Sequence, residues 1–170
     1  LQSGQERITV SLLEDDLSVG ESTDNAIEDI ERVRLKLQKT IEEHFEKELS
    51  FRKAKRGLKV LSLFFIDEVA KYRFYDDDGQ QQGPYAVMFE QEFIKLAKSK
   101  KFSPLFDGQD LTDEARAAHN GYFSIDKNKR FVETSESSET GRQAAEDGYR
   151  LIMKDKERLT SFETKLRFLF

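Results

Sequence analysis

The sequence predicts an α/β fold, in which a mainly parallel sheet is flanked by helices. The segment Leu58–Asp67 is short and almost continuously apolar, which is typical of a strand covered on both faces. A second apolar segment, Leu166–Phe170, closes the sequence. Helical patterns separate the two segments, and strands joined by helical crossovers are typically parallel. We therefore expect Leu58–Ile66 and Leu166–Phe170 to be parallel strands of one sheet.

The composition is that of a globular protein with a highly charged surface. Charged residues make up 36% of the 170 residues and hydrophobic ones 37%, and this length suits one well-buried core. No apolar run approaches the roughly 20 residues that a membrane span needs, and the first residues lack a signal-peptide pattern. The chain has no cysteine, which excludes disulfides and thiol catalysis. We expect a cytoplasmic protein without a membrane partner.

Residues 1–56 are predicted to hold a short strand and a long amphipathic helix that leads into the sheet. Apolar and polar residues alternate over Ile8–Leu13. The helix begins near Asp24, with Ser22, Thr23 or Asp24 as N-cap, and continues to Ser50. Such a helix either packs across the sheet or docks on a neighbouring domain, and both interpretations stay open. Its apolar stripe, in steps of three and four, is Ile27, Ile30, Val33, Leu37, Ile41, Phe45 and Leu49.

Residues 57–170 are predicted to hold the sheet and the remaining helices. Asp67 is placed to cap a short helix, and a polar loop then runs from Asp76 to Pro84, which opens a second helix. That helix has one apolar face between Tyr85 and Ala97. A small β-hairpin insertion is expected at residues 122–134, and the pattern between Lys101 and Ala117 is weak. A last helical region is expected to turn five residues inward: Ala145, Tyr149, Ile152, Leu159 and Phe162.

Two basic clusters stand out in a chain whose formal net charge is −5. The first, Arg52–Lys59, closes the long helix, and Gly57 suits a left-handed C-cap. Cations at a helix C-terminus interact favourably with the helix dipole, so this cluster has a structural interpretation beside a phosphate-binding one. The second cluster includes Lys98, Lys100 and Lys101, which have no evident partner in the sequence. We predict that these three lysines contact nucleic acid.

Catalytic motifs are scarce. The sequence has no glycine-rich phosphate loop, and its two histidines lie in unrelated segments. We interpret His44 as a partly buried helix residue, whereas His119 is either structural or faces a ligand. The segment Glu163–Lys165 matches half of a metal-dependent nuclease motif, which makes a small nuclease the weakest hypothesis. The adjacent carboxylates Asp76–Asp78 lack the spacing of a calcium loop.

Three segments together resemble the restriction (Res) subunit of type III restriction-modification enzymes. They are Gly57–Asp67, His119–Asp126 and Tyr149–Phe162, and Ile41–Glu48 adds a further similarity. The resemblance implies a superfamily 2 helicase-type motor, in which two RecA-like lobes hydrolyse ATP on DNA and are coupled to a nuclease domain. It runs from about residue 35 to Phe170. The chain then corresponds to part of the second lobe, and we interpret its end within a strand as a cut before motif V.

The resemblance also implies roles for individual residues. Leu58–Asp67 matches the strand of helicase motif IV, and ligands of α/β sheets gather at the carboxyl ends of the strands. His119 and Asn120 stand where many such motors have a His-Gly turn; Asn120 replaces the more common glycine and also tolerates a left-handed backbone. No catalytic, cofactor-binding or metal-binding residue is predicted. The predicted nucleic-acid-binding residues are Asp67, Lys98, Lys100, Lys101, His119 and Asn120.

The partners implied by the resemblance are DNA, the first helicase lobe and the nuclease domain of the same subunit, and the modification (Mod) methyltransferase subunit. ATP and Mg²⁺ are expected for the parent protein only. Motif V and motif VI with its arginine finger are missing, so this segment alone is expected not to hydrolyse ATP. The alternative is a stand-alone protein-interaction module that uses the long amphipathic helix.

Overall fold

The computed structural model describes residues 7–8, 17–18, 26–66, 68–123, 146 and 149–170. The chain divides into two compact units, Leu1–Arg32 and Val33–Phe170. In the first unit, β1 (Arg7–Ile8) pairs antiparallel with β2 (Leu17–Ser18). Of the strand predicted at residues 8–13, only Ile8 is described, and the three candidate caps of the long helix lie outside the described residues.

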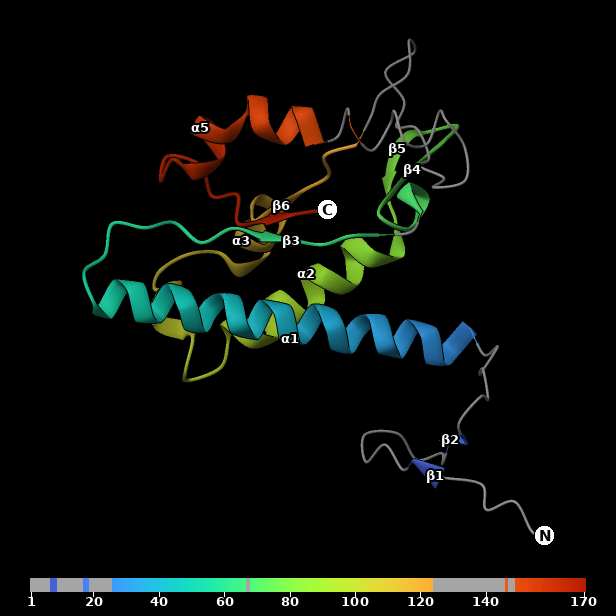
Figure 1. Cartoon of the computed structure of the whole chain (residues 1–170), viewed down its shortest axis with the longest axis horizontal. Helices are drawn as coiled ribbons and strands as arrows, with labels where there is room; N and C mark the ends of the chain where they lie inside the picture. Colours follow the sequence, from blue (N-terminus) through green and yellow to red (C-terminus); the bar gives the residue numbers. More distant parts are fainter. Residues whose placement is uncertain (1–6, 9–16, 19–25, 67, 124–145, 147–148) are drawn as a thin grey trace, which may run out of the picture. The chain divides into compact units, whose positions relative to one another are not determined.

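The long helix is confirmed as α1 (Ala26–Lys53) (Figure 1). Its stripe faces the core of the second unit, because Leu37, Ile41 and Phe45 are buried and Val33 and Leu49 are partly buried against them. The stripe breaks down towards the start of the helix, where the side chain of Ile30 is exposed.

The end of α1 corrects the predicted C-cap. The backbone N–H of Arg56 donates to the carbonyl of Phe51 at 2.9 Å, and that of Lys55 to Arg52 at 3.1 Å, which is the Schellman arrangement. The left-handed residue is Lys55, with φ of 51°, and not Gly57. Because helical geometry stops at Lys53, the left-handed position falls two residues before the glycine.

The main sheet of the second unit has, within the described residues, three strands in the order β3-β7-β6. They are β3 (Ser62–Leu63), β6 (His119–Asn120) and β7 (Phe168–Leu169). Both outer strands run parallel to β7, and Ser62 and His119 lie on either side of Phe168. The predicted parallel pairing of the two apolar segments is confirmed.

The strand β3 lies beside β7 as an outer strand, which corrects the prediction that Leu58–Asp67 is covered on both faces. Phe64, directly after β3, turns inward and stacks on Phe170 with ring centroids 4.6 Å apart. On the opposite face Leu63 is 44% exposed and Phe65 is 92% exposed. The strand with both faces buried is β7. A continuous apolar run does not by itself distinguish a central strand from an outer one that has an apolar outward face.

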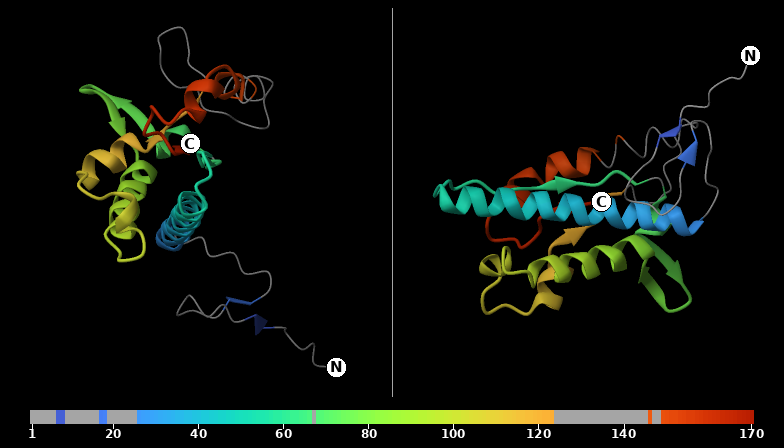
Figure 2. Two further views of the ribbon diagram at one scale, coloured as in Figure 1. Left: turned by 90° about the vertical axis from the view of Figure 1, so that its left-hand side faces the viewer. Right: turned by 90° about the horizontal axis from the view of Figure 1, so that it is seen from below.

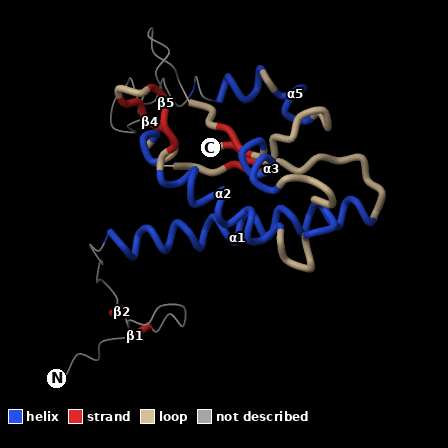
Figure 3. Tube along the Cα trace, turned by 180° about the vertical axis from the view of Figure 1, so that it is seen from behind, coloured by secondary structure: helices blue, strands red, loops and turns tan. Residues whose placement is uncertain are grey.

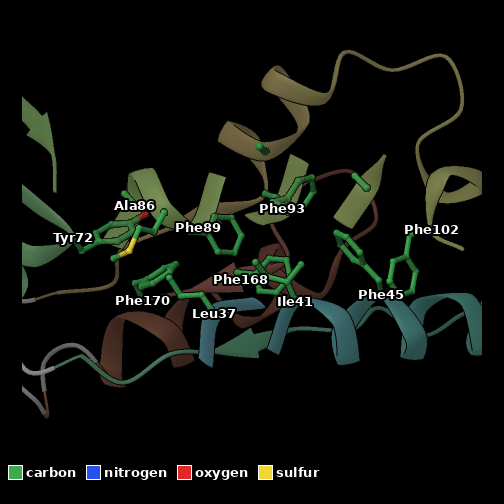
Figure 4. Close-up of a cluster of buried hydrophobic side chains, with 14 of the residues drawn as sticks. Leu37, Ile41, Phe45, Tyr72, Ala86, Phe89, Phe93, Phe102, Phe168 and Phe170 are labelled. Atoms are coloured by element: carbon green, nitrogen blue, oxygen red, sulfur yellow. The ribbon is translucent and has the colours of Figure 1, made fainter. Parts of the chain in front are cut away.

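Helices cover both faces of the sheet (Figure 2). On one face, α1 and α2 (Pro84–Ala97) enclose an aromatic core around Phe89, Phe93 and Phe168 (Figure 4). On the other face, α5 (Lys156–Thr160) packs Leu159 against Leu166 and Leu169. A parallel sheet flanked by helices confirms the α/β class and is consistent with a partial RecA-like lobe. The predicted second helix is confirmed with its start at Pro84.

Two further features differ from the predictions (Figure 3). The polar loop is a hairpin of β4 (Arg73–Asp76) and β5 (Gly79–Gln82), preceded by the 3₁₀ turn Val69–Lys71. After the 3₁₀ turn Ser103–Leu105, the weakly patterned region contains α3 (Leu111–Ala117), whose N-cap Asp110 accepts hydrogen bonds from two backbone N–H groups. Residues 124–134 of the hairpin insertion predicted at 122–134 lie outside the described residues.

The last helical region is only partly as predicted. Leu159 is buried and Ile152 is partly buried, but Tyr149 is 62% exposed and Phe162 is 69% exposed. Phe162 leaves the helical phase because α5 ends at Thr160 and the next residue is extended. Ala145 lies outside the described residues. Among the helices in the described ranges, none combines the length and apolar character needed to cross a membrane.

Candidate functional site

The predicted nucleic-acid-binding residues that the structure describes lie at opposite ends of the sheet. His119 and Asn120 form β6 and lead to the carboxyl end, which we define by Gly121–Phe123, Phe170 and the residues that contact them. The three lysines follow α2 and lie near the end of α1, because Lys101 pairs with Glu46 of α1. This is the amino end of the sheet, where residues 52–60 and 162–167 approach β3 and β7 (Figures 1 and 2). Asp67 lies outside the described residues.

At the carboxyl end, His119 is 4% exposed and both of its ring nitrogens have protein partners. Nδ1 lies 2.8 Å from the Tyr72 hydroxyl, and Nε2 lies 3.3 Å from a carboxylate oxygen of Glu90. Burial lowers the pKa of His119, with Glu90 acting in the opposite direction, and burial raises the pKa of Tyr72. These directions fit a neutral imidazole that accepts from Tyr72 and donates to Glu90. A contact between His119 and nucleic acid stays a prediction.

The turn after His119 is shaped by packing. Asn120 lies in β6, and its carbonyl accepts from the Phe170 N–H at 3.0 Å. Neither Asn120 nor Gly121 has a left-handed φ. A Cβ on Gly121 would lie 2.3 Å from a ring atom of Phe123 and 2.8 Å from one of Tyr72. The glycine therefore provides space for two aromatic rings.

At the amino end, one of the three predicted lysines has a partner that the sequence did not indicate. The ammonium of Lys101 hydrogen-bonds the Glu46 carboxylate, and this bond raises the pKa of Lys101 and lowers that of Glu46. Lys98 and Lys100 are exposed, and within the described part of the chain their amino groups form no hydrogen bond or ion pair. The predicted cationic patch thus contains two unengaged lysines beside a paired one.

A pocket of about 300 Å³ opens at the same end of the sheet. Its walls come from the end of α1, the approach to β3, the residues around the start of α3 and the approach to β7. Five cationic side chains and two carboxylates line it: Arg52, Arg56, Lys59, Lys165 and Arg167 with Glu48 and Glu114. The sequence showed the cluster at residues 52–59. It could not show that the parallel pairing of β3 and β7 adds Lys165 and Arg167.

A network of buried polar groups forms the floor of this pocket. Glu114 is 1% exposed and pairs with Lys165 and with Arg167, whose Nη1 lies 3.5 Å away. Arg167 also contacts Glu48 through Nε at 3.2 Å. Burial raises the pKa of Glu48, but the hydrogen bond from His44 and the charge of Arg167 outweigh it and leave that pKa below its usual value. The network joins α1, α3 and the segment directly before β7.

His44 completes the network and is buried more deeply than predicted, with 1% exposure. Its Nδ1 lies 2.9 Å from the Ser62 hydroxyl and its Nε2 lies 3.3 Å from Glu48. The half-motif at Glu163–Lys165 has its lysine engaged by Glu114. In the described ranges, no group of three or more histidine, aspartate or glutamate side chains is placed to hold a metal ion.

The chain is similar to the Res subunits of type III restriction-modification enzymes, which confirms the resemblance seen in the sequence. It is 28% identical over 141 residues to the EcoPI Res subunit of Escherichia phage P1. It is 29% identical over 140 residues to the EcoP15I Res subunit of Escherichia coli. Each alignment covers 79% of this chain but only 13% of the relative. No family model matches the chain, and no solved structure matches it.

Proposed function

We propose that this chain is part of the DNA-translocating motor of a type III Res subunit, where it engages the DNA backbone and packs against the first lobe. The observation that carries the proposal is the similarity to two curated Res subunits over 79% of the chain. The parallel order β3-β7-β6 supports it, because RecA-like lobes are built on such sheets. In the parent protein, ATP and Mg²⁺ drive the motor and the Mod subunit is the partner. This segment alone is inert towards ATP.

The proposed DNA contact is made by Lys98 and Lys100. Both side chains are exposed and unpaired within the described part of the chain, whereas Lys101 is held by Glu46. Ammonium groups without carboxylate partners are available to phosphates, and phosphate contacts carry no direct sequence information. The net charge of −5 opposes binding. We therefore expect sequence-independent affinity no tighter than about 10⁻⁴–10⁻⁶ M, decreasing steeply with salt.

A titration of fluorescent single- and double-stranded DNA at low salt tests this proposal. We expect the double variant Lys98→Glu, Lys100→Glu to lose binding. The matched control is Lys154→Glu, Lys156→Glu, which makes the same charge change at exposed positions in and beside α5. Retained binding by the control and loss by the first variant support the proposal. Equal binding by all three proteins, or equal loss by both variants, contradicts a specific patch at the end of α2.

A further inference from the structure

We propose that the pocket at the amino end of the sheet binds a compact phosphate group, either a free polyphosphate or the terminal phosphate of a nucleic-acid strand. This site is distinct from the backbone contact of Lys98 and Lys100 and goes beyond the proposed function. The inference rests on the charges, the hydrogen bonds and the shape of the pocket.

The two carboxylates of the pocket are already neutralised by protein groups. Glu114 pairs with Lys165 and Arg167, and the Gln109 amide lies beside it and donates to it when its nitrogen is oriented towards the carboxylate. Glu48 is engaged by His44 and Arg167. The negative charges of Glu48 and Glu114 are thus balanced within the protein by Lys165 and Arg167. The cations left to face the pocket are Arg52, Arg56 and Lys59.

Lys59 is held in position for a ligand. Its amino group donates to the carbonyls of Ser161 at 2.6 Å and Thr164 at 2.9 Å, which leaves its third N–H for another acceptor. Burial lowers the pKa of Lys59, and the charge of Arg167 lowers it further. A bound anion would offset both effects. The amino group therefore lies where added negative charge is favourable.

The two arginines supply further donors at the end of α1. Arg52 uses one N–H on the carbonyl of Pro104 at 2.9 Å and keeps its other donors. The Schellman cap fixes the backbone of Arg56, while its exposed guanidinium forms no hydrogen bond or ion pair within the described ranges. A guanidinium presents parallel N–H donors that match two phosphate oxygens.

The shape of the pocket favours a compact ligand. About 300 Å³ is at the small end of ligand-binding pockets and accommodates a short polyphosphate. Three separate stretches of the chain, residues 48–60, 105–114 and 162–167, line it, so a strand end enters more readily than the middle of a continuous duplex. Compact, multiply charged phosphates also gain the most from three cations that line one pocket.

The test uses calorimetric titration of the full 170-residue chain with sodium tripolyphosphate. Arg56→Gln is expected to weaken binding by about tenfold, as for the loss of a charge-assisted hydrogen bond. Lys53→Gln is the matched control, because it removes one charge from the same helix end outside the pocket. Lys59→Gln serves as a second variant, with its folded state checked by circular dichroism. Equal weakening by Arg56→Gln and Lys53→Gln, or no binding at millimolar tripolyphosphate, overturns the proposal.

Competition experiments distinguish the possible sources of the phosphate. A 5′-phosphorylated oligonucleotide that displaces tripolyphosphate indicates a strand end, whereas displacement by tripolyphosphate analogues alone indicates a free polyphosphate. An unphosphorylated oligonucleotide that competes equally well overturns the assignment to a compact group. The variant Lys98→Glu, Lys100→Glu is expected to keep its affinity for tripolyphosphate, so failure of the DNA contact and failure of the pocket are separate outcomes.

Discussion

The two ends of the sheet differ in how their ionisable groups are satisfied. At the carboxyl end, His119 is buried between Tyr72 and Glu90 and has protein partners on both nitrogens. At the amino end, cations outnumber carboxylates around an open pocket, and unengaged lysines lie nearby. Ligands of open α/β sheets usually gather at the carboxyl ends of strands. Among the described residues, however, the surplus positive charge lies at the opposite end.

The same fold uses polar residues for two purposes. The triad Tyr72–His119–Glu90 links the start of the hairpin, β6 and α2, which are far apart in the sequence. The pocket network also joins distant segments, but it leaves Arg52, Arg56 and Lys59 facing open space. Buried polar groups that are fully paired specify structure, whereas cations without a carboxylate partner keep N–H donors available for ligands.

The largest expected effect comes from breaking the amino-end network at Glu114. Changing Glu114→Ala leaves Lys165 without its carboxylate and Arg167 with Glu48 alone. Lys165 is 59% exposed and can be hydrated, but Arg167 is only 15% exposed and loses one of its two carboxylates, so we expect a loss of about 3 kcal/mol in the free energy of unfolding. Urea denaturation measures it. Glu163→Ala, at an exposed position nearby, is the control with little expected change, and equal losses would show that the network contributes nothing specific.

A smaller effect is expected from a pair of glycine substitutions, one at each end. Gly121→Ala places a Cβ within 2.8 Å of two aromatic rings at the carboxyl end, and overpacking of this kind costs about 1–3 kcal/mol. At Gly57, before β3, an added Cβ meets no atom within 4 Å and φ is not left-handed. Gly57→Ala should therefore be neutral or stabilising by up to about 1 kcal/mol. Thermal unfolding of both variants checks the difference, and a destabilised Gly57→Ala protein would contradict the open geometry.

The main secondary structure could be predicted from local patterns. Both long helices and the parallel pairing followed from apolar spacing and from Pro84, which marks a helix start. The outer position of β3 could not be predicted, because local sequence patterns do not show which of the three strands lies in the middle of the sheet. The sequence does contain one local signal for α3, because Asp110 directly precedes the helix as its N-cap.

The candidate sites were less predictable because they depend on tertiary neighbours. Lys101 appeared unpaired in the sequence, and only packing of α2 beside α1 brings Glu46 to it. Lys165 and Arg167 appeared as ordinary charges near the end of the sequence, yet the sheet places them against Glu114. Charge pairs between distant segments leave no periodic pattern, so spacing rules do not detect them.

The smallest expected effect concerns the pH dependence of stability at the carboxyl end. Because the pKa of His119 is lower in the folded state than its usual value of about 6.5, the unfolded chain binds more protons below neutral pH. Its contribution to stability is therefore fully present above that value and decreases as the pH falls towards the folded pKa. The effect is small, since Glu90 opposes the burial that lowers the pKa.

Replacing His119→Gln tests this dependence, because glutamine keeps polar atoms near Tyr72 and Glu90 but does not titrate. Urea denaturation between pH 5 and pH 7.5 is expected to show a steeper loss of stability for the original protein than for the variant. Carboxylates elsewhere titrate in both proteins, so the difference between the two curves isolates His119. Parallel curves would mean that folding leaves the pKa of His119 unchanged, which contradicts the predicted dominance of burial over Glu90. The electrostatic part of the contrast between the two ends would then have no support.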